Sequence, residues 1–167
     1  MEDAMRDQVA KTIFGTHLSS ENLSQLLSQA TIIHLSGGEF LFREGERDDR
    51  VFLLLDGQVD LAMTVPGRGL VRVLSLGAGE IIAWSSILGD GLMTCSAVCT
   101  KPAALLSVDC EQLRMAIETN QRFGYEFMNM MASALARRLL ATRLQLLDLF
   151  EAGSAGRSAM MPHQQVT

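Results

Sequence analysis

The spacing of hydrophobic residues changes twice along the chain. Up to about residue 30 the apolar side chains recur at helical spacing, with Leu23, Leu26 and Leu27 on one face. Ser19 stands before this run in the place of a helix N-cap, where a side-chain oxygen accepts from a backbone N–H. The pattern predicts two short helices within residues 1–30.

Residues 31–109 alternate between apolar and polar side chains in short runs, which is the pattern of β-strands. Asp56-Gly57 suits a tight hairpin turn between two such runs. Pro66-Gly67 and Lys101-Pro102 separate further runs. These signals predict about eight short antiparallel strands, as in a small barrel or sandwich.

After residue 109 the spacing becomes helical again. A short helix is predicted to begin at Asp109 or Cys110, and a long helix to run from about Gln121 to Phe150. One face of the long helix repeats apolar residues in steps of four and three, which is the seam that two packed helices need. This seam consists of Met128, Ala132, Leu135, Leu139, Thr142, Leu146 and Leu149.

The long helix also carries a second apolar stripe, formed by Phe127, Met131 and Ala134. A helix that is apolar on two faces needs two partners, and the strands can cover only one face. The sequence therefore predicts a homodimer through this helix, with burial inside its own chain as the alternative. Residues 151–167 are small and polar without periodicity, and we predict a disordered tail there.

These patterns define an α+β fold. It has N-terminal helices in residues 1–30, an antiparallel β-barrel in residues 31–109, and C-terminal helices in residues 110–150. The segment from Leu76 to Thr100 interrupts the strands with glycines, whose uncovered N–H groups can cradle an anion. Glu80 follows this turn as an acceptor suited to sugar hydroxyls or amines. The segment is therefore predicted to bind a ligand.

Composition excludes several classes of function. The 167 residues carry a net charge of -5, whereas a nucleic-acid surface needs a clustered positive excess. The three cysteines and three histidines show neither a disulfide framework nor metal-ligand spacing. The N-terminus has no signal-peptide core and no apolar run is long enough to span a membrane, so a cytoplasmic protein is expected. No catalytic constellation stands out, which argues against an enzyme.

Three stretches resemble the cyclic-nucleotide-binding domain, and more closely the effector domain of the catabolite-activator/fumarate-nitrate-regulator family of bacterial sensors. They read EFLFREGERDDRVFLLLDGQVDL, LGAGEIIA and ALARRLLATRLQLLDLF, and the resemblance covers roughly residues 20–150. It implies a jelly roll (double-stranded β-helix) with a long dimerisation helix. The family's winged helix-turn-helix normally follows that helix. Only the short tail remains here, so no direct DNA binding is expected.

The resemblance also implies how a cyclic nucleotide or another small effector would be held, with no further cofactor. Glu80 matches the glutamate that accepts the ribose 2′-hydroxyl, and Thr94 matches the Ser/Thr that bonds the phosphate. Met93 falls at the family's phosphate-binding arginine. Thr142 matches the residue that reaches the base, and Arg143 beside it is a candidate for the missing cation. The implied ligand site comprises Gly79, Glu80, Ile81, Met93, Thr94, Cys95, Thr142 and Arg143.

Met93 changes what this site is expected to bind. Losing one member of a buried charge pair typically costs ~2–5 kcal/mol, so the ligand need not be cAMP or cGMP. Each of the two central residues has a structural alternative: core packing for Met93, and a carboxylate satisfied by its own loop amides for Glu80. Two functions follow. The first is a ligand-sensing regulatory domain; the alternative is a degenerate, ligand-free dimer that binds a protein partner.

Overall fold

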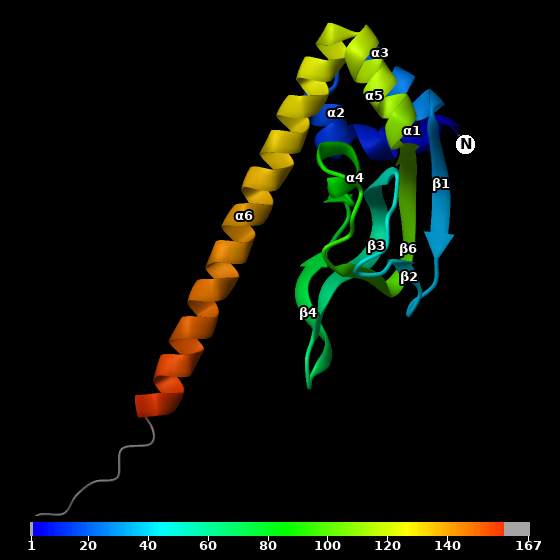
Figure 1. Ribbon diagram of the computed structural model, residues 1–167. Coiled ribbons are helices and arrows are strands. Elements are labelled where there is room, and N and C mark those ends of the chain that lie inside the picture. Colours follow the sequence, from blue (N-terminus) through cyan, green and yellow to red (C-terminus); the bar gives the residue numbers. More distant parts are fainter. Residues whose placement is uncertain (1, 159–167) are drawn as a thin grey trace, which may run out of the picture. The chain divides into compact units, whose positions relative to one another are not determined.

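The computed structural model describes residues 2–158, with side chains described for residues 6–147. The chain divides into two compact units, Met1–Ala134 and Leu135–Thr167. The first unit contains the strands, and it also holds most of the helices (Figure 1).

Three helices open the chain, where two were predicted. They are α1 (Glu2–Ala10), α2 (Ile13–His17) and α3 (Ser20–Ser28). The additional break lies at Thr12, whose side chain accepts from the backbone N–H of Phe14 and caps α2. Ser19 caps α3 as predicted, since its hydroxyl accepts from the N–H of Asn22 at 3.4 Å.

The strands form one antiparallel jelly-roll sheet, which does not close into a barrel among the described residues. Its order is β1-β6-β3-β4, with β2 on β6 and β5 on β3 (Figure 1). The strands are β1 (Ala30–Leu35), β2 (Phe40–Phe42), β3 (Arg50–Val65), β4 (Gly69–Leu76), β5 (Ile81–Ile82) and β6 (Ser96–Asp109). A short helix, α4 (Ser85–Leu88), follows β5.

Two of the predicted turns are wrong. β3 continues through Asp56-Gly57 without a turn, and β6 continues in the same way through Lys101-Pro102. The two sites lie opposite each other in the β3–β6 pairing. The register shifts on both sides of Asp56, which indicates a β-bulge. Gly57 has φ +94°, and a Cβ there would lie 2.2 Å from the carbonyl oxygen of Pro102. Each long strand therefore contains two predicted strands, so the described sheet has six strands rather than about eight.

The turn at Pro66-Gly67 is confirmed. β3 and β4 pair up to Val65 and Gly69, and the N–H of Arg68 donates to the carbonyl of Val65 at 3.0 Å. Gly67 and Gly69 both have positive φ, which glycine adopts without steric cost. The hairpin thus forms where the local signal and the long-range pairing agree.

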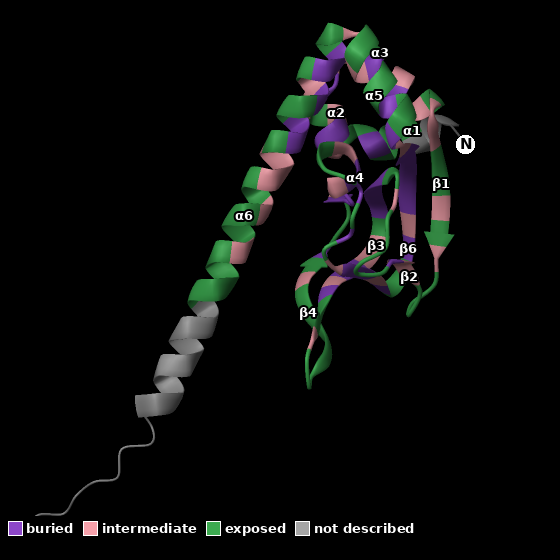
Figure 2. Ribbon diagram, in the orientation of Figure 1, coloured by how far each residue is buried: buried purple, intermediate pink, exposed green. Residues whose placement is uncertain are grey.

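Two hydrophobic clusters make up the core of the first unit. Their buried positions are among the purple segments of Figure 2. One joins the helices to β3 and β6, and includes Phe14, Leu26 and Leu53. The other fills the roll and includes Phe52 and Met93. Burying such side chains contributes about 1.5–3 kcal/mol each, which makes the roll a rigid support for its loops.

The C-terminal helices begin where they were predicted. Asp109 caps α5 (Cys110–Thr119), since its carboxylate accepts from the N–H of Gln112 at 2.9 Å. α6 runs from Gln121 to Ser158, so the helix ends further along the chain than Phe150. The rest of the predicted tail, residues 159–167, lies outside the described residues.

The two predicted stripes of α6 differ in burial. Phe127 and Met131 are 0% and 1% exposed and belong to the helix-side core, which confirms the second stripe. In the seam, Leu139 is 53% and Leu146 50% exposed. Leu149 is outside the residues whose side chains are described. The seam is therefore available for a partner, and the homodimer stays a prediction.

Candidate functional site

The candidate site is the segment of residues 77–96, which we call the cassette; it contains β5 and α4. Its first turn is closed by Glu80. The N–H of Gly77 donates to Glu80 Oε2 at 2.7 Å, and the N–H of Glu80 donates back to the carbonyl of Gly77 at 3.3 Å. The N–H of Gly79 and the carbonyl of Glu80 both pair with Leu54 of β3, at 2.7 and 3.0 Å. The turn is thereby fixed to the sheet.

The same turn occurs twice more among the described residues, at residues 36–39 and 43–46. In both, a glycine with positive φ precedes a glutamate whose carboxylate accepts from the first N–H of the turn. For Glu46 this bond, from Arg43, measures 2.7 Å. The three stretches read SGGE, REGE and GAGE, so the repeat is visible in the sequence. The Glu80 carboxylate therefore accepts from an amide of its own loop, as the structural alternative states. A contact between Glu80 and a ligand stays a prediction.

Two of the predicted ligand residues are core residues. Ile81 is 3% exposed and pairs with Leu53 in the sheet. Met93 is also 3% exposed, and its Sδ lies 3.8 Å from the hydroxyl of Ser85. The backbone of Met93 bonds to the 43–46 turn on both sides, each time at 2.8 Å. Met93 thus packs in the core, as its structural alternative states, and joins the cassette to a neighbouring turn.

Thr94 and Cys95, which follow Met93, are closer to solvent. Thr94 is exposed, and Cys95 is half-buried and forms no disulfide among the described residues. The other two cysteines are buried, and burial raises the pKa of Cys110 to about 11. A thiol with a raised pKa is a poor nucleophile and metal ligand. Among the described residues no group of three His, Cys, Asp or Glu side chains could hold a metal ion.

The link between β5 and α4 is strained. Ala83 has φ +62°, and in the described part of the chain it is the one non-glycine residue with positive φ. A left-handed alanine costs roughly 1–2 kcal/mol. Trp84 follows it with 37% of its surface exposed, and the buried hydroxyl of Ser86 has no hydrogen-bond partner among the described atoms. No sequence signal identifies Ala83, because alanine is not a residue type that favours a left-handed backbone.

The cassette has no cation of its own, since residues 73–100 contain no Lys, Arg or His. Arg47 and Arg114 reach it from outside. Arg47 Nη2 lies 3.2 Å from Asp90 Oδ2, and Arg114 Nη2 donates to the carbonyl of Ser86 at 2.5 Å. The pKa of Asp90 is lowered, first by the hydrogen bond from the N–H of Leu92 and then by the charge of Arg47. Neither arginine was identified from the sequence.

The remaining two predicted residues lie in the second unit. The Thr142 hydroxyl donates to the carbonyl of Arg138 at 2.9 Å, and Arg143 is exposed. Their contact with a ligand therefore stays a prediction. The described part of the chain contains no helix long and apolar enough to cross a membrane.

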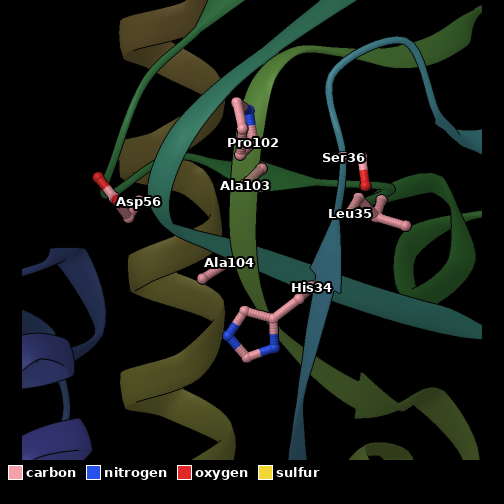
Figure 3. A pocket seen from close by; sticks show the side chains of 7 residues that line it. All are labelled: His34, Leu35, Ser36, Asp56, Pro102, Ala103 and Ala104. Atoms are coloured by element: carbon pink, nitrogen blue, oxygen red, sulfur yellow. The ribbon is translucent and has the colours of Figure 1, made fainter.

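A separate depression of about 450 Å³ lies at the bend of β3 and β6 (Figure 3). His34 of β1 and Asp56 of β3 both stand in register with Ala104 of β6, on either side of that strand. The depression is lined by His34, Leu35, Ser36, Asp56, Pro102, Ala103 and Ala104. None of the predicted ligand residues lines it, so it is distinct from the cassette.

Comparison with known proteins agrees with this geometry. The family model described as the cyclic nucleotide-binding domain matches residues 32–120. The chain is 27% identical over 137 residues to the CRP-like cAMP-activated global transcriptional regulator of Mycobacterium tuberculosis. The match covers 82% of this chain and 59% of the regulator, so the chain spans under two thirds of that relative's length.

Solved structures show the same fold. A cyclic nucleotide-binding domain from Methylobacillus flagellatus superposes with a TM-score of 0.79 at 21% identity, covering 87% of this chain and 84% of that one. A putative cyclic nucleotide-binding protein from Geobacter metallireducens gives 0.70 at 28% identity, covering 80% and 96%. The catabolite activator protein of Thermus thermophilus gives 0.65 at 27% identity, covering 83% and 62%.

Proposed function

Because the chain belongs to the cyclic nucleotide-binding domain family, we propose that it is a non-catalytic, cytoplasmic regulatory domain that senses a small effector at the cassette. The observation that carries this proposal is the left-handed Ala83 between β5 and α4. Strained backbone persists where the surrounding structure enforces it, and it gathers at ligand clamps and switches. Thr94 and Trp84 are both exposed in the same cassette, so polar and aromatic groups are available to an effector.

The proposed effector lacks a strong negative charge. The cassette sequence itself contains no Lys, Arg or His, and Arg47, which reaches it, is paired with Asp90. Glu80 is acidic, and Met93 is buried where the family resemblance implies an arginine. A charge-assisted phosphate clamp is the strong interaction of such sites. Without it, cAMP and cGMP are expected to bind about 30-fold to several thousand-fold more weakly than they would with that arginine.

Titration calorimetry with cAMP and cGMP tests this proposal. We expect dissociation constants above about 100 µM for the wild type. Thr94→Arg is the matched variant, because Thr94 is exposed and accepts a cation without burying it. Met93→Arg is unsuitable, since a charge at a side chain that is 3% exposed would cost stability. Thr94→Arg should tighten cyclic-nucleotide binding, because a charge-assisted bond to the phosphate is stronger than the hydroxyl bond that it replaces. Submicromolar binding by the wild type would contradict the proposal.

The alternative function is a ligand-free domain that binds a protein partner. It is favoured by the Glu80 carboxylate, which accepts from its own turn at 2.7 Å, and by the burial of Met93. Glu80→Gln distinguishes the two functions. If Glu80 anchors an effector, the variant should bind that effector more weakly; if it only closes the turn, it should lose stability alone.

We also propose that α6 forms a homodimer through its seam. Leu139 and Leu146 are half-exposed leucines in the four-three pattern, and such residues pack against a second helix. Leu139→Asp places a charge in this seam, and sedimentation should then show a monomer. Ala141→Asp is the matched control, since Ala141 is exposed on the same helix outside the seam. A monomeric wild type at micromolar concentration would refute the dimer.

A further inference from the structure

The edge strand β4 has a free side. It pairs with β3 along one edge, and no strand among the described residues pairs with its other edge. Such an edge presents a row of backbone N–H and C=O groups that can template a further strand. Most of β4 is also exposed, as Figure 2 shows.

The β3–β4 hairpin, residues 61–76, carries an apolar face whose outer part is exposed. In this outer part Met63 stands opposite Val71. Leu61 and Leu74, which also stand opposite each other, are half-buried against the core cluster of the roll. Met63 is 42% exposed and Val71 is 37% exposed. Natural edge strands are usually short or blunted by charges. This one is apolar over most of its length.

The hairpin also stands clear of the rest of the sheet. The β3–β6 ladder ends at Ala62 and Ser96. Further along β3, the backbone N–H of Thr64 donates to Glu44 Oε2 at 2.8 Å and not to a residue of β6. Beyond this anchor the hairpin extends past the other strands (Figure 1). Its edge is therefore accessible without any movement of the core.

The charge of the hairpin is opposite to that of the protein. Residues 61–76 contain Arg68 and Arg72 and no acidic residue, although the whole chain has a net charge of -5. Arg72 lies 3.8 Å from Asp60, and its side chain remains 67% exposed. Arg68 is exposed near the turn. The hairpin is thus a basic and apolar region on an acidic protein.

We propose that the free edge of β4 docks an extended segment of a partner protein in which apolar residues alternate with acidic residues. In strand addition, main-chain hydrogen bonds supply affinity and alternate side chains supply specificity. Apolar side chains of the segment pack beside Val71, and its carboxylates face Arg68 and Arg72. A second copy of β4 fits less well, because its arginines would meet those of the first copy.

The test uses a fluorescein-labelled octapeptide of alternating valine and glutamate, titrated with the full chain and followed by fluorescence anisotropy. We expect binding that weakens with salt and that Arg68→Glu weakens about fivefold. Lys11→Glu is the matched control, since it makes the same charge change at an exposed residue outside the hairpin. Val71→Ser should also weaken binding, whereas Met115→Ser, at a residue 52% exposed on α5, should not.

Amide chemical-shift changes on adding the peptide should fall on residues 69–76. The proposal is overturned if the peptide does not bind, or if a valine–lysine octapeptide binds as well. It is also overturned if the shifts fall in the cassette. If phosphatidylserine vesicles bind with the same dependence on Arg68 while the peptide does not, the edge recognises an anionic membrane surface instead. Loss of wild-type self-association in Val71→Ser would assign the edge to a second copy.

Discussion

Glu126 joins α6 to the N-terminus of α3, and its ionisation should control the stability of the first unit. Its Oε2 accepts from the N–H of Ser19 at 2.8 Å and from the amide of Asn22 at 2.7 Å. Its Oε1 accepts from Arg122 Nε at 3.0 Å. The bond from the N–H of Ser19, followed by those from Asn22 and Arg122, lowers the pKa of Glu126 from its usual 4.5 to about 2.

This pKa difference is a difference in folding free energy. At about 1.4 kcal/mol per pKa unit it corresponds to roughly 3 kcal/mol. Solvent contact at the carboxylate, whose side chain is 14% exposed, reduces this to roughly 2 kcal/mol. Because the pKa is lower in the folded state, the contribution is complete above pH 4.5. It is lost as the pH falls from 4.5 towards 2.

Urea unfolding of the wild type and of Glu126→Gln, at pH 7 and at pH 3, measures this contribution. The variant keeps an acceptor oxygen but loses the charge, so it should be less stable by about 1–2 kcal/mol at pH 7. The difference should shrink at pH 3. Glu118→Gln, at an exposed residue on α5, is the control and should change little. An equal difference at both pH values would refute the reasoning.

Two backbone predictions follow from positive φ angles and are tested by the same unfolding assay. Ala83→Gly should stabilise the fold by about 1 kcal/mol because it relieves the left-handed alanine, and unchanged or lower stability would contradict the strain. Gly57→Ala should destabilise by more than about 2 kcal/mol, because its Cβ would meet the carbonyl of Pro102 at 2.2 Å. Gly67→Ala, where a Cβ has open space, should cost less, since it carries the φ penalty alone.

The helices and the strand-rich middle were predictable because periodicity reports burial directly. Phe127 and Met131 face the core as their spacing indicates. The hairpin turn predicted at Asp56-Gly57 is wrong because a turn signal is local. The pairing of β3 with β6 is long-range, and in it the glycine occupies a β-bulge. The strand count failed for the same reason.

The candidate site was less predictable than the fold. Glu80 was identified as a ligand acceptor, yet the repeated Gly-Glu turns show that its carboxylate also has a local partner. The left-handed backbone of Ala83 and the reach of Arg114 to Ser86 depend on tertiary contacts, which no single stretch of sequence encodes.

Native mass spectrometry of the purified chain tests most directly the claim that the cassette senses an effector without a strong negative charge. The account predicts a stoichiometric small-molecule adduct that is released on unfolding and contains no phosphate. An adduct with the mass of cAMP or cGMP would contradict the proposed charge of the effector. A chain that carries no adduct would contradict effector sensing and favour the ligand-free interaction domain.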